Sequence, residues 1–147
     1  MNTAGALPPV SLYVHLPWCE RKCPYCDFNS HERDVIPQRQ YLAALLADLR
    51  ESLDQLQGRS LSSLFLGGGT PSLFGAQSIE HLLAAVRDHV PLAGNFEATM
   101  EANPGSAEAG RFMGYREAGI TRLSLGIQSF DDQALTALGR VHDSNQA

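Results

Sequence analysis

The sequence predicts an α/β protein with parallel strands, and two features carry that prediction. Short apolar segments alternate along the 147-residue chain with longer segments whose apolar residues recur at spacings of three and four. Glycine-rich or polar residues also follow the predicted strands. Four successive strand–helix units imply a parallel sheet with right-handed crossovers, which is either an open doubly wound sheet or part of a barrel.

The first unit joins a strand over residues 11–16 to a helix that begins near Pro37. In the strand, His15 lies opposite the apolar face, and a hydrogen-bonded structural histidine is the favoured interpretation. A leucine-rich stripe runs along the helix and predicts a core contact, and Gly58 supplies its stop. The strand's apolar face carries Leu12, Val14 and Leu16.

The other three units repeat this order. The predicted strands cover residues 63–68, 96–102 and 121–127. One predicted helix carries the apolar stripe from Ile79 to Val86. The next covers residues 106–118 and ends at Gly119, and the last begins at Asp131 and ends at Gly139. Gly110 and Gly114 weaken the helical pattern of the segment 106–118, because glycine lowers helix propensity.

The sequence ends soon after the fourth unit. A four-strand parallel sheet leaves an unprotected edge, since such sheets are normally covered. We therefore expect residues 1–10 to be a flexible N-terminus, and residues 11–147 to be a core domain that is truncated at its C-terminus.

Composition excludes several classes of protein. With 44% hydrophobic and 18% charged residues the chain is typical of a folded protein and not of a disordered one. Its net charge of −5 disfavours nucleic-acid binding. It has neither an apolar run of membrane-spanning length nor a secretory signal, so we predict a cytoplasmic protein.

All three cysteines fall in one loop after the first strand: Cys19, Cys23 and Cys26. In a reducing compartment, thiols this close together indicate a metal or redox site rather than a structural disulfide. The C-x3-C-x2-C spacing allows one loop to surround a cuboidal iron–sulfur cluster. A zinc site completed by His15 or His31, and a group of free thiols, remain alternatives.

The other strands end on further candidate residues. Ligands of parallel α/β folds bind at the carboxyl ends of the strands, so we expect all of these residues to meet at one rim. Glycines after the second strand would let the backbone approach a ligand and expose N–H groups. The candidates are Gly68, Gly69 and Thr70 after the second strand, Glu101 after the third, Gln128 after the fourth, and Arg140 beyond it.

Together, "YVHLPWCERKCPYCDF", "LFLGGGTPS", "EANPG" and "RLSLGIQSF" resemble the radical S-adenosylmethionine (SAM) superfamily. The resemblance is to the branch that holds oxygen-independent coproporphyrinogen III oxidase and the heme chaperones. It extends from Ser11 to His142, but covers only the front of that family's usual length. It implies that the chain forms the N-terminal part of a partial (βα) barrel.

The resemblance also implies a site. Cys19, Cys23 and Cys26 would hold a [4Fe–4S] cluster with one iron left open, and SAM would bind that iron through its amino and carboxylate groups. In the family, an electron from the cluster cleaves SAM reductively. The residues that match positions lining the SAM site are Tyr13, Tyr25, Gly68, Gly69, Thr70, Glu101, Gln128 and Arg140.

One position separates the members of the branch. The oxidase has a further cysteine two places after the last cluster ligand, where this chain has Phe28. The resemblance therefore favours a heme chaperone, which binds heme and passes it to acceptor proteins, with heme contacts outside these residues. An electron donor for the cluster is a further expected partner. Oxidative decarboxylation of coproporphyrinogen III without oxygen, and a structural zinc module, are the alternatives.

Overall fold

A parallel sheet of four strands in the order β1-β4-β5-β6 is the frame of the computed structural model, which describes residues 7–105 and 110–147. Its strands are β1 (Val10–Leu16), β4 (Leu61–Gly68), β5 (Leu92–Ala102) and β6 (Arg122–Leu125). The helices are α1 (Gln38–Ser52), α2 (Ala76–His89), α4 (Phe112–Ala118) and α5 (Asp132–Ala137), with the 3-10 turns η1 (Leu53–Leu56) and η2 (Pro71–Leu73).

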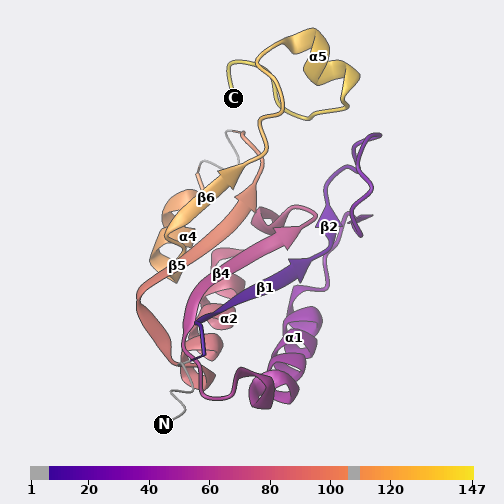
Figure 1. Cartoon of the computed structure of the whole chain (residues 1–147). Coiled ribbons are helices and arrows are strands. Elements are labelled where there is room, and N and C mark those ends of the chain that lie inside the picture. The colour runs from indigo at the N-terminus through magenta and orange to yellow at the C-terminus, as the bar shows by residue number, and fades with distance from the viewer. Residues whose placement is uncertain (1–6, 106–109) are drawn as a thin grey trace.

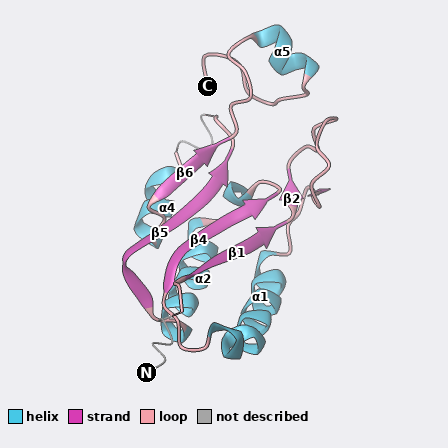
Figure 2. Cartoon of the chain, in the orientation of Figure 1, coloured by secondary structure: helices cyan, strands magenta, loops and turns pink. Residues whose placement is uncertain are grey.

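The strand order decides between the two predicted architectures. Each strand pairs with the next long strand in the chain, all of them parallel, so the order never reverses. Figure 2 shows α1, α2 and α4 together on one face of the sheet. A doubly wound sheet would reverse its strand order and place helices on both faces. The fold is therefore of the singly wound, barrel-like kind.

The core lies between the sheet and these helices. Alternate strand residues point to the helices because successive side chains of a strand face opposite ways. Val14, Leu16, Leu64, Leu66, Ala98 and Met100 are buried from the strands, and Leu42, Leu46, Ile79, Leu82, Leu83 and Val86 from the helices. Burial of this apolar surface is the main stabilising term, and it fixes the sheet rigidly beneath the strand ends.

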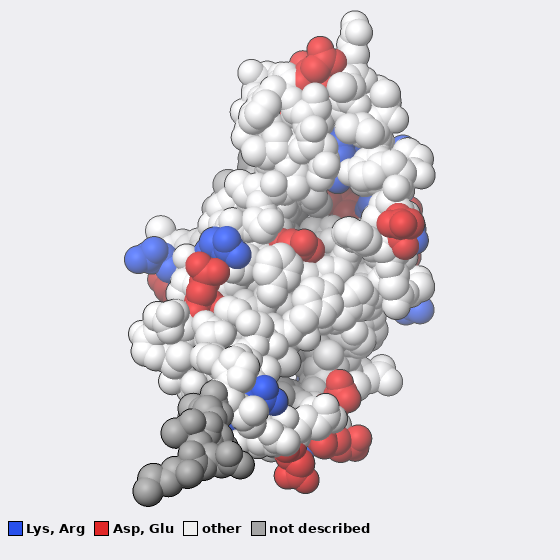
Figure 3. Space-filling model, in the orientation of Figure 1, with Lys and Arg blue, Asp and Glu red and all other residues white. Residues whose placement is uncertain are grey.

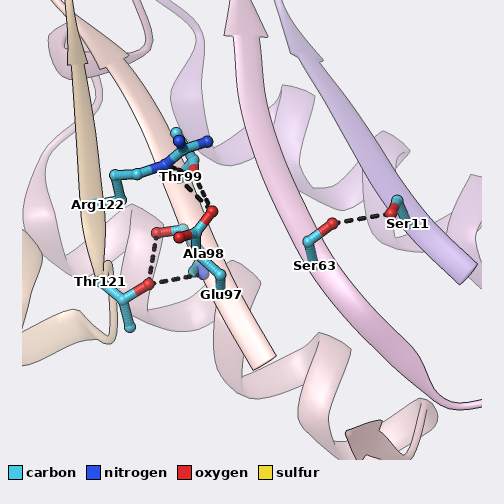
Figure 4. Close-up of polar contacts among 7 residues, drawn as sticks. All are labelled: Ser11, Ser63, Glu97, Ala98, Thr99, Thr121 and Arg122. Atoms are coloured by element: carbon cyan, nitrogen blue, oxygen red, sulfur yellow. Dashed lines mark hydrogen bonds and ion pairs between the residues drawn. The ribbon is translucent and has the colours of Figure 1, made fainter. Parts of the chain in front are cut away.

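The helix-free face of the sheet carries polar side chains (Figure 4). On β5 and β6, Arg122 Nε lies 3.1 Å from Glu97 Oε1 and donates to Thr99 Oγ1 at 2.9 Å. On the other two strands, Ser63 Oγ donates to Ser11 Oγ at 2.8 Å. The ion pair is half exposed, so it contributes little stability. This face therefore combines polar side chains with the stacked rings of Tyr13 and Phe65.

The predicted strands and helices are confirmed, but several of their ends differ. Strand β4 begins at Leu61 and not at residue 63, and strand β6 ends at Leu125 and not at residue 127. Strand β1 begins at Val10, inside the predicted flexible segment, whose residues 1–6 lie outside the described residues. Strand β5 begins at Leu92 and not at residue 96, because a register shift accommodates the glycine and asparagine that hid its start. Helix α4 begins at Phe112, and residues 106–109 of its predicted span also lie outside the described residues.

The predicted stops are confirmed at Gly119 and Gly139, whereas α1 ends at Ser52 and the turn η1 at Leu56, before Gly58. Gly58, Gly119 and Gly139 have φ values of 73°, 111° and 70°, in the left-handed region where glycine is favoured. The sequence did not predict a two-stranded parallel pair, β2 (Trp18–Cys19) with β3 (His31–Glu32), which closes the base of the cysteine loop. Strands this short have no periodicity to detect.

Beyond the strand tips, α5 and the C-terminal segment form a small lobe (Figure 1). The short β2–β3 pair and the loop above it stand beside the lobe on the same end of the sheet. The cysteine loop and the segment after α5 therefore come close in space, although more than a hundred residues separate them in the chain, as between Cys23 and Arg140.

Tyr115 should be a main stabilising residue of the helical layer. Its fully buried hydroxyl donates to the carbonyl oxygens of Ser72 at 2.6 Å and Phe74 at 3.0 Å, which joins α4 to the turn η2. Tyr115→Phe leaves both buried carbonyls without this donor, and we expect it to lower the free energy of unfolding by about 1 to 3 kcal/mol.

Urea unfolding followed by circular dichroism measures this change. Tyr25→Phe is the matched control, because the Tyr25 ring is 48% exposed, and we expect it to change stability by less than about 0.5 kcal/mol. Equal effects of the two substitutions would contradict the assignment.

Candidate functional site

A cavity of about 320 Å³ lies at the carboxyl ends of the strands, between the cysteine loop and the segment around α5. Figure 3 shows the surface hollowed below the α5 lobe, with acidic and basic side chains at the hollow. The predicted site residues that line the cavity are Cys19, Cys23, Tyr25, Cys26, Gly68, Gly69, Thr70, Glu101, Gln128 and Arg140. Tyr13 is the predicted residue that does not line it.

The cysteine loop brings three free thiols to this cavity. Cys19 is buried in β2, where its neighbour across the ladder is Glu32. Cys23 and Cys26 are half-buried, and the Cys26 N–H donates to the Cys23 carbonyl oxygen at 3.0 Å, which closes a tight turn between them. Sequence spacing and this turn together point the loop's thiols into one space.

Three thiols at one cavity are a soft donor set of the kind that iron–sulfur clusters take. Over residues 7–105 and 110–147, no three His, Cys, Asp or Glu side chains are gathered closely enough to hold one ion. Thiolates that bind three different irons of a cluster lie further apart than thiolates that share one ion. Three thiols spread around one cavity wall are therefore compatible with a cluster.

The geometry also weakens the zinc alternative. Both ring nitrogens of His15 are engaged, Nδ1 with the Tyr13 hydroxyl at 3.1 Å and Nε2 with the Asn29 carbonyl oxygen at 2.8 Å. His31 is exposed in β3, and neither histidine is among the residues that line the cavity. The interpretation of His15 as a hydrogen-bonded structural residue is confirmed by these contacts.

The glycine loop after β4 approaches the start of the cysteine loop at backbone distance. The Gly69 N–H donates to the Leu16 carbonyl oxygen at 2.9 Å, and the Thr70 N–H donates to that of Trp18 at 2.7 Å. A Cβ at Gly69 would lie 2.5 Å from the Trp18 oxygen. Only glycine allows this approach, because real Cβ atoms do not come so near a backbone oxygen.

The expectation that this loop exposes free N–H groups is wrong. Besides the two contacts above, the Gly68 N–H donates to Glu101 Oε2 at 3.1 Å. Gly68 has a φ of 120°, and a Cβ there would lie 2.7 Å from the His15 ring. The glycines therefore hold the two loops and Glu101 together, and leave a cavity wall without side chains.

Glu101 connects this wall to Tyr13. The Glu101 carboxylate and the Tyr13 ring both lie against Gly67. A Cβ added to Gly67 would be 3.1 Å from Glu101 Oε2 and 3.0 Å from the Tyr13 ring. Burial, followed by the nearby Glu101 charge, raises the pKa of Tyr13. Tyr13 therefore stays protonated at neutral pH and lies beside the site, outside the cavity.

Arg140 joins the cysteine loop to the ends of β5 and β6. Its Nη1 donates to Cys23 Sγ at 3.3 Å and to the Tyr25 hydroxyl at 3.4 Å. Its Nη2 donates to Asn103 Oδ1 and to the Gly126 carbonyl oxygen, both at 2.7 Å. The guanidinium thus joins one of the three thiols to the ends of β5 and β6.

Tyr25 is held in the same network. Burial raises the pKa of Tyr25, and the Arg140 charge offsets part of that rise. The hydroxyl therefore stays protonated at neutral pH and remains able to donate a hydrogen bond into the cavity.

Asn103 and His142 support the predicted cofactor-binding residues. Asn103 lines the cavity, and its Nδ2 lies 3.5 Å from Thr70 Oγ1, so it links the β4 loop to Arg140. Gln128 has a φ of 69°, and this backbone conformation is uncommon outside glycine. The turn that carries it is held by buried His142, whose Nε2 lies 2.9 Å from the Ile127 carbonyl oxygen. Asn103 follows Glu101 at the end of the third predicted strand, so the strand-end rule already placed it at this rim, whereas nothing in the sequence pointed to His142.

Comparison with known proteins gives one family. Residues 13–147 match the model of the radical SAM superfamily. The chain is 53% identical over 146 residues to the heme chaperone HemW of Haemophilus influenzae, and 50% identical over 142 residues to that of Escherichia coli. In both cases 96% of this chain covers 38% of the relative, so the chain spans well under half of their length.

A solved structure has the same fold. The coproporphyrinogen III oxidase HemN of Escherichia coli, described as a radical SAM enzyme, matches 94% of this chain with a TM-score of 0.83 and 30% identity, over 32% of its own length. A more distant relative, 39% identical over 137 residues, is the mitochondrial radical SAM domain-containing protein 1 of mouse. No helix in the described part of the chain is long and apolar enough to cross a membrane.

The close approach at Gly69 gives a direct test of the site's frame. Gly69→Ala places a methyl group against the Trp18 peptide, so we expect the two loops to separate. The Gly69 and Thr70 amides should then exchange at least about ten-fold faster with solvent, and the emission of Trp18, the single tryptophan of the chain, should shift to the red.

Gly94→Ala is the control, because nothing lies within 4 Å of a Cβ there. Hydrogen exchange followed by NMR compares the two variants. Unchanged protection of Thr70 in Gly69→Ala would show that the loops are not held by this contact.

Proposed function

The chain belongs to the radical SAM superfamily, and we propose that it forms the cluster- and SAM-binding part of a heme chaperone. One observation carries the proposal: a single cavity is lined by all three cysteines and by residues from the carboxyl ends of β4, β5 and β6. Identity of 53% and 50% to two heme chaperones supports the choice of function.

In this proposal the thiolates of Cys19, Cys23 and Cys26 bind three irons of a [4Fe–4S] cluster, and the fourth iron is left for SAM. When bound, the two cofactors supply one-electron chemistry that side chains cannot perform. The free thiols suit a reducing compartment such as the cytoplasm, which is where we expect the protein to act.

The chain's own residues position these groups and control their charge. Arg140 donates to Cys23 Sγ, and a hydrogen bond to a cluster sulfur raises the cluster's reduction potential. The Glu101 carboxylate is fixed by the Gly68 N–H, with its second oxygen left to accept from an amine or hydroxyl of the ligand. The bare glycine wall lets SAM approach the backbone.

Phe28 supports the chaperone over the oxidase. It lines the cavity with 61% of its surface exposed, at the position where the oxidase has its further cysteine. An apolar ring there supplies no thiol for chemistry on a substrate. Heme, acceptor proteins and an electron donor are the partners that this proposal requires.

A second candidate is coproporphyrinogen III oxidation. The observation that favours it is the fold match to HemN, with a TM-score of 0.83. At 30% identity, compared with 53% for the heme chaperone, that match is the weaker support.

Anaerobic reconstitution with iron and sulfide tests the cluster. We expect about four irons and four sulfides per chain and a broad visible absorption band. Each change Cys19→Ala, Cys23→Ala or Cys26→Ala should abolish the band. His31→Ala should leave it intact, since the zinc alternative alone uses that ring. A colourless protein that binds one zinc ion would contradict the proposal.

A full-length version that includes the expected heme contacts, reconstituted in the same way, separates the two functions. With SAM and a reductant, we expect it to consume no coproporphyrinogen III, and we expect it to transfer heme to an apo-hemoprotein. Porphyrinogen turnover would instead establish the oxidase.

A further inference from the structure

We propose that Lys22 is a positioning residue that holds the cysteine loop open for the cluster from outside the cavity, an inference that rests on the proposed cluster site. Lys22 directly precedes Cys23, yet it is not among the residues that line the cavity. Its side chain turns back across the loop instead of into the site.

The contacts of Lys22 connect the two arms of the loop. Its Nζ donates to the carbonyl oxygens of Ser30 at 3.1 Å and Phe28 at 3.3 Å, in the arm that follows the cysteines. Its backbone N–H donates to Glu32 Oε2 at 3.1 Å. One residue therefore fixes the arm that carries Cys23 against the arm that returns to β3.

The returning arm depends on such donors. Successive carbonyl groups of a non-helical segment point in different directions and need partners when they are shielded from water. The carbonyls of Phe28 and Ser30 are bound by the ammonium, and that of Asn29, between them, by His15 Nε2. Without Lys22, only the Ser30 N–H and hydroxyl would remain on the Phe28 oxygen.

The choice of lysine is itself informative. Lys22 is the single lysine of a sequence whose other strongly basic residues are all arginine. An ammonium is a compact donor that can serve two converging carbonyl oxygens on one side, whereas the planar guanidinium is suited to a carboxylate. Lys22 accordingly lies where two carbonyl oxygens converge. Arg140 lies where four acceptors surround its guanidinium, namely a thiol, a hydroxyl and two oxygens.

Cys23 is consequently held from two sides. Lys22 anchors the backbone just before it, and Arg140 anchors its sulfur. A cluster with one free iron has only three protein ligands, so loss of one of them would cost a large share of its binding. A loop held in shape before the cluster arrives reduces the ordering that binding requires.

The hydrogen bonds from Lys22 to Phe28, Ser30 and Glu32 are called the clamp below. Amide exchange of the cluster-free chain tests it directly. The Cys26 N–H, bonded to the Cys23 carbonyl, and the Ser30 N–H, bonded to the Phe28 carbonyl, report on the loop. In Lys22→Met we expect both to exchange roughly ten-fold faster, because two charge-assisted hydrogen bonds are lost. The Gly69 amide, outside the loop, should be unchanged.

Arg33→Met is the matched control. Arg33 is an exposed cation at the base of the same loop, and the contact that the structure gives it is its backbone N–H to the Cys19 carbonyl oxygen. The Arg33→Met substitution removes one positive charge and leaves the hydrogen bonds of Lys22 in place. We expect wild-type exchange in the loop and a wild-type content of iron and sulfide after reconstitution.

Reductive methylation of the folded wild-type chain adds a test that cannot disturb folding. Dimethyl-Lys22 keeps its charge but has one N–H left, so it can serve one carbonyl only. We expect intermediate exchange of Cys26 and Ser30. Lys22→Arg keeps the charge and several N–H donors, but in a planar arrangement. We expect its exchange rates at Cys26 and Ser30 to be intermediate as well.

Cluster content connects the clamp to function. After reconstitution, Lys22→Met should hold several-fold less iron and sulfide than wild type, with part of the EPR signal converted to a three-iron form. Wild-type exchange and wild-type cluster content in Lys22→Met would overturn the inference. Faster exchange with unchanged cluster content would also overturn it, because Lys22 would then be a loop brace without effect on the site.

The outcomes distinguish this inference from the proposed function. If wild type itself binds no cluster, the proposed function fails, while amide exchange still decides whether Lys22 shapes the loop. If wild type and Lys22→Met bind it equally, the proposed function stands and the role of Lys22 is refuted.

Discussion

The site depends on one backbone contact, the continuation of the β1–β4 pairing beyond the ends of both strands. The Gly69 and Thr70 amides donate to the carbonyls of Leu16 and Trp18 at 2.9 and 2.7 Å. These bonds carry the parallel ladder into the segment that leads to Cys19. Because a Cβ at Gly69 would overlap the Trp18 peptide, the contact requires glycine. The position of the first thiol is thereby set by the rigid sheet and not by a free loop.

The other end of the cysteine loop is held by charge. Arg140 reaches from beyond α5 to Cys23, and at the same time to Asn103 and Gly126 at the ends of β5 and β6. The loop carries both signs of charge, with Arg21 and Lys22 beside Glu20, Asp27 and Glu32. Arg140 is therefore important for its place rather than for an excess of positive charge, since it is the cation that contacts a thiol.

Most of the fold was predictable because buried strands and amphipathic helices leave periodic patterns. The strand ends were predictable for the same reason, and these ends bring Gly68, Glu101 and Gln128 to one rim with the cysteines. The β2–β3 pair was not predictable, since two-residue strands have no period. The partners of the glycine-loop amides were not predictable either. These amides bind Leu16, Trp18 and Glu101 instead of facing the cavity. Such contacts join segments far apart in the chain, and only their geometry reveals them.

The central claim is that three thiols hold a cluster with one iron free for SAM. EPR of the reduced, reconstituted protein with and without SAM tests it most directly, because a ligand that binds an iron changes the signal of that cluster. We expect a [4Fe–4S] signal that shifts when SAM is added and that is absent in Cys23→Ala. A cluster signal that SAM leaves unchanged, at concentrations far above those of the protein, would contradict it.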